Sequence, residues 1–185
     1  GGPKSPRQIG RSEGGWQQLV QREMRPDAFG AGDRDGCLRR GEFADALAAA
    51  TGAAHHDIAV VLGSGWKPAA DQMGDVVAEL PMTELGGFPE ASVQGHGTTV
   101  RSIINGDRRI LAFMGRVHLY EGHHPNVVAH GVRTAVRAGC GTVVLTNAAG
   151  GLRPGMRPGQ PVLIADHLNL TGRTPLLGPN DDRIG

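Results

Sequence analysis

Short runs of aliphatic and β-branched residues alternate along this chain with polar, glycine-rich segments. Runs of this length and composition are typical of buried strands, because β-branched side chains pack well on a pleated surface. We expect strands at residues 57–62, 76–80, 99–104, 108–114, 142–146 and 161–165. Asn105-Gly106 separates two of these runs and predicts a tight hairpin, because this pair readily adopts the backbone of a two-residue turn.

Two further segments carry helix signals. Residues 42–51 are good helix formers and are followed by Gly52, a residue type that commonly terminates helices. Residues 125–138 begin with a proline, carry valines at helical spacing and are followed by Gly139. Strands that alternate with helices in this way predict an α/β fold, with helices packed on a central sheet.

The first 41 residues differ from the rest of the chain. They are rich in glycine and arginine and show no sustained hydrophobic period, so we expect a poorly ordered extension at residues 1–41. The predicted strands and helices all lie in residues 42–185, which we expect to form one domain. A chain of 185 residues is long enough to bury one hydrophobic core.

Composition and charge narrow the class of protein. Hydrophobic residues make up 39% and charged residues 20% of the chain, as in globular proteins. The net charge of +1 does not favour binding to nucleic acid or to an anionic membrane.

The sequence also predicts where the protein is located. The longest apolar run, residues 58–62, is too short to span a bilayer, and the N-terminus does not resemble a secretory signal. Cys37 and Cys140 lack the spacing of a disulfide framework or a thiolate zinc site, so we expect a reducing, cytoplasmic location.

Three glycine-rich or polar loops follow predicted strands, and ligand sites in α/β sheets lie beyond the carboxyl ends of strands. The first loop, Gly63-Ser64-Gly65, offers backbone N–H groups and a hydroxyl that suit a phosphate. It is neither a complete dinucleotide fingerprint nor a P-loop. The alternative interpretation is a tight turn between a strand and a loop. The other two loops are residues 115–124 and 147–151.

In the second loop, functional side chains alternate along the chain at Arg116, His118 and Tyr120. In an extended backbone all three would project from one side. Arg116 could hold an oxyanion with two parallel hydrogen bonds, and His118 could donate to it or move a proton near neutral pH. Tyr120 offers a flat face to a sugar or base, and Glu121 could orient a basic neighbour. The alternative is a solvated polar loop.

We predict no metal site. The cluster His118, Glu121, His123 and His124 lacks the helical H-E-x-x-H spacing of zinc enzymes. Residues 31–42 imitate a calcium-binding loop, but its first position is an alanine without a ligand oxygen. His96 lies between two glycines, which would let the backbone approach a ligand and leave the imidazole accessible. The alternative is an ordinary histidine in a turn.

Six motifs occur in a fixed order along the chain: Leu62-Gly63-Ser64-Gly65, Gly95-His96-Gly97, Gly115-Arg116-Val117-His118-Leu119-Tyr120-Glu121-Gly122-His123, Thr146-Asn147-Ala148-Ala149-Gly150-Gly151-Leu152, Asp166-His167-Leu168-Asn169-Leu170 and Gly178-Pro179-Asn180-Asp181. Over about residues 42–185, their order and separations closely resemble the trimeric class of purine nucleoside phosphorylase. The related methylthioadenosine phosphorylases tend to carry threonine where Ser64 stands and a different loop at residues 146–150.

The resemblance implies a mixed central sheet flanked by helices and a reversible phosphorolysis of purine (2′-deoxy)ribonucleosides to free base and (deoxy)ribose 1-phosphate. It places inorganic phosphate as co-substrate, with no metal and no organic cofactor. The implied phosphate site is Ser64, His96, Arg116, His118 and the backbone N–H of Ala148. The implied nucleoside contacts are Tyr120, Asn147, Ala149 and Gly150, with Glu121 in a supporting role.

The resemblance also implies partners: a purine nucleoside, phosphate and two further copies of the chain in a homotrimer, with no nucleic acid and no membrane. Residues 42–185 would form only part of the family's domain, because the groups that grip the base are expected beyond Gly185. We therefore expect the 185-residue chain by itself to be inactive. The alternative is a truncated, non-catalytic relative that binds phosphate or acts as an interaction module.

Overall fold

The computed structural model describes residues 45–85, 87–89 and 99–177 of the chain. Residues 45–51 are helical, as expected, and Gly52 follows them with a positive φ of 65°. The remaining elements are β1 (Ile58–Val61), η1 (Lys67–Gln72), β2 (Asp75–Pro81), η2 (Met82–Leu85), β3 (Thr99–Asn105), β4 (Arg108–Phe113), η3 (Leu119–Glu121), α3 (Pro125–Val128), α4 (His130–Arg137) and β5 (Thr142–Leu145). The extension expected at residues 1–41 lies outside the described residues.

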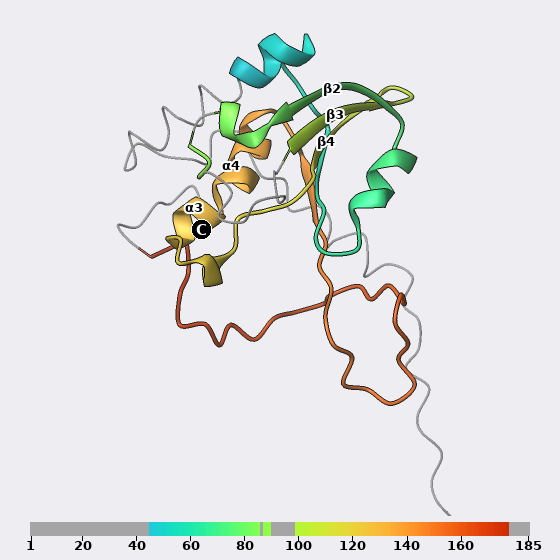
Figure 1. The fold of residues 1–185 in the computed structure, drawn as a ribbon, viewed down its shortest axis with the longest axis vertical. Helices are drawn as coiled ribbons and strands as arrows, with labels where there is room; N and C mark the ends of the chain where they lie inside the picture. The colour runs from blue at the N-terminus through green and yellow to red at the C-terminus, as the bar shows by residue number, and fades with distance from the viewer. Residues whose placement is uncertain (1–44, 86, 90–98, 178–185) are drawn as a thin grey trace, which may run out of the picture.

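The five strands form one mixed sheet in the order β2-β3-β4-β1-β5, which confirms the predicted fold class (Figure 1). β2, β3 and β4 pair in antiparallel fashion, and β1 lies parallel to both β4 and β5. The hairpin at Asn105-Gly106 is confirmed: Asn105 faces Arg108 across the turn, and Gly106 has a φ of 59°. Three parallel strands therefore end at the same edge of the sheet, where the polar loops begin.

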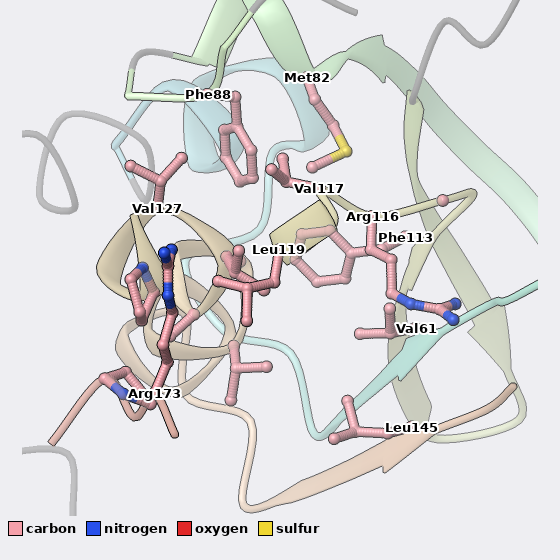
Figure 2. A pocket seen from close by; sticks show the side chains of 17 residues that line it. Val61, Met82, Phe88, Phe113, Arg116, Val117, Leu119, Val127, Leu145 and Arg173 are labelled. Carbon is pink, nitrogen blue, oxygen red and sulfur yellow. The ribbon is translucent and has the colours of Figure 1, made fainter. Parts of the chain in front are cut away.

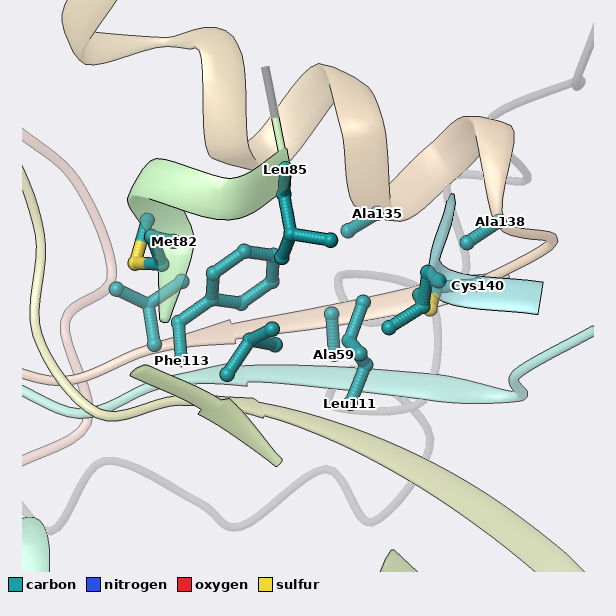
Figure 3. Packing of buried hydrophobic residues seen from close by; sticks show 11 residues of the cluster. Ala59, Met82, Leu85, Leu111, Phe113, Ala135, Ala138 and Cys140 are labelled. Carbon is teal, nitrogen blue, oxygen red and sulfur yellow. The ribbon is translucent and has the colours of Figure 1, made fainter. Parts of the chain in front are cut away.

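Both faces of the central strands are buried, which explains why β1 is apolar throughout rather than alternating. On one face, Ala59 packs in a cluster with Phe113 of β4 and with Ala135 of α4 (Figure 3). On the opposite face, Val60 packs in a second cluster with Ile103, and Ala70 of η1 belongs to the same cluster. Successive residues of a strand point to opposite faces, so neighbouring residues of β1 serve different clusters.

The predicted helix at 125–138 is interrupted. The structure has two helices, α3 and α4, separated by Ala129, whose ψ of −7° lies outside the regular helical range. Pro125 begins α3 as predicted, and Gly139, with a φ of 91°, follows α4. α4 lies along the sheet, and Ala135 and the following Ala138 belong to the cluster packed against the strands (Figure 3).

The strand predicted at 161–165 is wrong, because no strand forms there. The side chains of Val162, Leu163 and Ile164 are 58%, 76% and 51% exposed. A strand needs a neighbour for its backbone hydrogen bonds, and within the described residues the sheet ends at β5. Residues 146–177 instead run away from the sheet and return to α3 (Figure 1). A run of aliphatic residues forms a strand only where a partner strand lies beside it.

Within the described ranges, no helix has the length and apolar character to cross a bilayer. Cys140 is buried and carries a free thiol. Burial raises the pKa of this thiol to about 12, so the reactive thiolate is not populated near neutral pH. Cys37 lies outside the described residues.

The buried His56, which precedes β1, contacts β3 and the residue that follows α4. His56 is fully buried; its Nε2 lies 2.9 Å from the Oγ of Ser102 in β3, and its backbone N–H donates to the carbonyl of Ala138 after α4. Burial, followed by the positive charge of Arg109 and the neighbouring His55, lowers the pKa of His56 to about 4. The folded protein therefore holds this imidazole neutral.

Acid should destabilise the fold through His56. The unfolded chain takes up a proton near pH 6.5, whereas the folded state resists protonation until about pH 4. The free energy of unfolding should therefore fall, by on the order of 1–2 kcal/mol, as the pH drops through this window. Urea denaturation at pH 7 and pH 4.5 measures the change. His56→Gln should lose most of it, while His55→Gln, at the exposed neighbouring position, should keep it; an equal pH dependence in His56→Gln would contradict the assignment.

Candidate functional site

Three strand ends converge at one edge of the sheet. Val61, the last residue of β1, is in register with Phe113 of β4 and with Leu145 of β5. The loops that follow these strands, predicted from the sequence as the candidate site, therefore begin next to one another. This arrangement agrees with the general placement of ligand sites at the carboxyl ends of parallel strands.

The first loop turns tightly at Gly63. The backbone N–H of Trp66 donates to the Gly63 carbonyl over 3.1 Å, and Gly65 has a φ of 82°, which favours glycine. Ser64, between these glycines, is exposed. A Cβ added at Gly63 would collide with the carbonyl oxygen of Thr146 and with Nη1 of Arg116. The absence of a side chain at Gly63 therefore lets all three loops meet.

Arg116 lies half-buried where the three loops meet. Its Nη1 donates to the carbonyl oxygen of Thr146 over 3.3 Å. Among the described residues this is the one hydrogen bond of the Arg116 side chain, whose guanidinium carries five N–H donors in all. A planar guanidinium next to a glycine turn is suited to an oxyanion such as phosphate.

His118 and Tyr120 form a second group. Their rings stack with centroids 4.7 Å apart and an interplanar angle of 19°. The backbone N–H of His118 donates to Oε2 of Glu121 over 2.9 Å, which gives Glu121 an orienting role within the loop. The extended backbone considered for this segment holds only as far as His118, because the short helix η3 begins at the next residue. The stack nevertheless leaves Tyr120 82% exposed at the surface.

The third loop, which contains Asn147, Ala148, Ala149 and Gly150, is exposed along its length. Nδ2 of Asn147 donates to the carbonyl of Ala148 over 3.2 Å. The Cα of Asn147 would lie 3.0 Å from a Cβ placed at Gly63. The structure thus brings the start of this loop against the first loop and Arg116. His96, the remaining predicted phosphate ligand, lies outside the described residues.

Beside the strand ends lies an apolar cavity of about 300 Å³ (Figure 2). Val61 and Leu145 at the strand ends lie on one side of it, and Val127 of α3 on the other. Arg116 and Arg173 are the charged residues in its lining. The cavity was not predicted from the sequence, because its walls come from segments far apart in the chain and no local motif indicates it.

No group of three or more His, Cys, Asp or Glu side chains in the described part of the chain is placed to hold a metal ion. In the histidine-rich loop, Nε2 of His123 lies 3.9 Å from Oε2 of Glu121. The calcium-like segment at residues 31–42 lies outside the described residues.

Thr146 is not among the predicted site residues, although it makes several contacts with the end of β1 and the first loop. Its Oγ1 accepts from the backbone N–H of Gly63 over 2.9 Å and donates to the carbonyl of Val61 over 3.0 Å. The available signal was a hydroxyl-bearing residue at the end of a predicted strand. That signal is weak, because threonine is common in strands for packing reasons alone.

Comparisons with known proteins show what this chain is similar to. The sequence of a purine nucleoside phosphorylase from Mycobacterium tuberculosis is 50% identical over 146 residues, which cover 79% of this chain and 54% of the relative. The rat purine nucleoside phosphorylase is 41% identical over 138 residues, which cover 69% of this chain and 45% of the relative. The chain thus spans about half the length of the curated relatives it matches.

Solved structures give the same result. Isoform 2 of purine nucleoside phosphorylase from Schistosoma mansoni, in complex with cytosine and ribose-1-phosphate, superposes with a TM-score of 0.70 at 28% identity. The match covers 80% of this chain and 52% of that chain. A second S. mansoni purine nucleoside phosphorylase structure, with inosine, gives a TM-score of 0.68 at 29% identity, again with 80% of this chain and 52% of that chain covered.

The family comparison covers most of the described residues. The sequence model of the phosphorylase superfamily matches residues 57–184, a span that begins just before β1 and includes all three candidate loops. Together with the relatives above, this match confirms the resemblance seen in the sequence motifs. The chain therefore belongs to the phosphorylase superfamily, and its relatives there are purine nucleoside phosphorylases.

Proposed function

We propose that the protein catalyses the reversible phosphorolysis of purine (2′-deoxy)ribonucleosides, which yields the free base and (deoxy)ribose 1-phosphate. The observation that carries this proposal is the position of Arg116. Its guanidinium lies beside the glycine turn at Gly63, where the loops after three strands meet, and a planar guanidinium in this place suits an oxyanion. The identity to purine nucleoside phosphorylases over 79% of the chain supports the same assignment.

Phosphorolysis requires a phosphate held against the anomeric carbon of the sugar. As the C1′–N9 bond breaks, its electron pair leaves with the purine, positive charge develops on the sugar, and a phosphate oxygen forms the new bond to C1′. The leaving base is neutralised by taking up a proton. A fixed phosphate anion stabilises the positive charge and replaces a bimolecular encounter with an oriented one.

We assign the phosphate to Ser64, Arg116, His118 and the backbone N–H of Ala148, with His96 completing the set. The exposed Ser64 hydroxyl and the Arg116 guanidinium belong to adjoining loops, which suits contact with one tetrahedral anion. Glu121 supports this side of the site by accepting from the backbone N–H of His118.

We assign the nucleoside to Tyr120 and to the loop residues Asn147, Ala149 and Gly150. The ring of Tyr120 stacks on His118, which we assign to phosphate binding. This position next to the phosphate site suits contact of Tyr120 with the ribose. The apolar cavity of about 300 Å³ lies beside the same strand ends. The proposed partners are a purine nucleoside, phosphate and further copies of the chain in a homotrimer, in the cytoplasm.

We propose that the 185-residue chain by itself is inactive. Several leucines of the segment after β5 are almost fully exposed, among them Leu152 at 99% and Leu170 at 90%. Apolar side chains at such exposure favour burial against further protein. The same observation favours the second candidate function, a non-catalytic relative that binds phosphate and acts through an interaction surface.

Turnover distinguishes the two functions. The protein encoded by the complete reading frame should release hypoxanthine from inosine only when phosphate is present, and it should form ribose 1-phosphate in equal amount. Guanosine and adenosine define the base preference, and 5′-methylthioadenosine tests the related activity. Phosphate binding without release of base from any of these nucleosides would contradict the catalytic proposal and support the non-catalytic one.

A further inference from the structure

We propose that Thr146 is a positioning residue that sets the affinity of the site for phosphate by locking the Gly63 turn and Arg116 to the end of β5. This inference rests on the function proposed above, because it concerns the same phosphate site. Thr146 belongs to neither the phosphate set nor the nucleoside set. Its contribution is to hold other loops in place.

The hydroxyl of Thr146 ties the end of β5 to the loop after β1. Oγ1 accepts from the backbone N–H of Gly63 over 2.9 Å and donates to the carbonyl of Val61 over 3.0 Å. The backbone N–H of Thr146 donates to the same Val61 carbonyl, also over 3.0 Å. These bonds link residues 83 and 85 positions apart, and the hydroxyl thereby satisfies a buried backbone donor at the start of the Gly63-Ser64-Gly65 loop.

The carbonyl of Thr146 contacts the second loop, which carries Arg116. It accepts from Nη1 of Arg116 over 3.3 Å, and it lies so close to Gly63 that a side chain there would collide with it. One residue therefore contacts the glycine turn through its hydroxyl and the guanidinium through its carbonyl. The position of Thr146 determines the spacing between the backbone N–H groups of the turn and the guanidinium.

Removal of the hydroxyl should release the turn without removing any group assigned to the ligand. Thr146→Val has nearly the same shape, so the β5 packing is kept, but it leaves the Gly63 N–H without its acceptor. An unsatisfied buried donor costs enough to disfavour the observed turn. We expect the dissociation constant for inorganic phosphate, and the KM for phosphate, to rise about tenfold. The KM for the nucleoside should change much less, because Thr146 holds the anion side of the site.

The experiment uses the protein of the complete reading frame and three variants. Thr146→Ser keeps the hydroxyl and should bind phosphate within about threefold of the unaltered protein. Thr142→Val makes the same chemical change at the opposite end of β5 and should leave phosphate binding unchanged. Calorimetry with inorganic phosphate gives affinity without relying on turnover, and thermal unfolding checks that each variant is folded.

A structural readout separates a local effect from a general loss of stability. Amide exchange at Gly63 should become about tenfold faster or more in Thr146→Val. The amide of Leu62, which donates to the Phe113 carbonyl over 2.9 Å, should exchange as before. Equal acceleration at both amides would mean that the substitution loosens the whole sheet, which would overturn the inference.

The remaining outcomes are distinct. An unaltered protein that binds phosphate but turns over no nucleoside contradicts the proposed function, and the affinities of the variants still decide the role of Thr146. Normal phosphate affinity in Thr146→Val, in an active protein, overturns the inference and leaves the proposed function standing. A Thr146→Ser variant as weak as Thr146→Val also overturns it, because the hydroxyl would then not be the group responsible. An unaltered protein that does not bind phosphate contradicts both.

Discussion

Arg116→Ala should reduce the use of phosphate by about a hundredfold or more, measured as kcat/KM for phosphate in the protein of the complete reading frame. The substitution removes a charged, planar donor from the meeting point of three loops and also removes the 3.3 Å bond to the Thr146 carbonyl. A phosphate in this site would lose a charge-assisted contact with the guanidinium.

Matched variants sharpen this experiment. Arg116→Lys keeps the positive charge but not the planar fork, and it should recover only part of the phosphate affinity. Arg157→Ala removes an exposed arginine from the segment after β5 and controls for the change in net charge. Arg116→Ala with a normal KM for phosphate, in a protein that requires phosphate for turnover, would show that the anion binds elsewhere.

Gly63→Ala should have the second large effect. A Cβ at this position would collide with the backbone carbonyl of Thr146 and with Nη1 of Arg116, and it would lie 3.0 Å from the Cα of Asn147. Backbone atoms cannot swing aside as a side chain can, so the loops after β1 and β5 must separate. We expect a loss of about 1–3 kcal/mol in the free energy of unfolding, together with a large loss of phosphate affinity.

Gly141→Ala is the matched control for this substitution, since a Cβ at Gly141 has nothing within 4 Å. It should leave both the stability and the phosphate affinity nearly unchanged. Urea denaturation measures the first quantity, and calorimetry with inorganic phosphate measures the second. A Gly63→Ala variant as stable and as tight for phosphate as Gly141→Ala would mean that the three loops do not meet closely in solution.

Local signals in the sequence were sufficient for most of the fold. The apolar run at β1 and the Asn105-Gly106 turn were predicted correctly, because backbone preference and burial act over a few residues. Pro125 and Gly139 likewise marked the ends of the helical segment. The failed strand at 161–165 has the same local signal, but within the described residues it has no strand beside it. Strand formation depends on a partner, and a partner is not a local property.

The candidate site likewise has features that the local sequence predicts and features that depend on contacts between distant segments. The residue types that follow each strand can be read from the sequence, which therefore places Gly63, Arg116 and Asn147 in loops at strand ends. The packing of the sheet was needed to show that these loops touch, that His118 stacks on Tyr120 instead of lying in line with Arg116, and that Thr146 joins the loops. The His118–Tyr120 stack forms where the backbone turns into η3 after His118, and the contacts between the loops link residues 30 to 85 positions apart. Their geometry is set by the parallel pairing of β1 with β4 and β5, which brings three distant chain segments to one edge of the sheet.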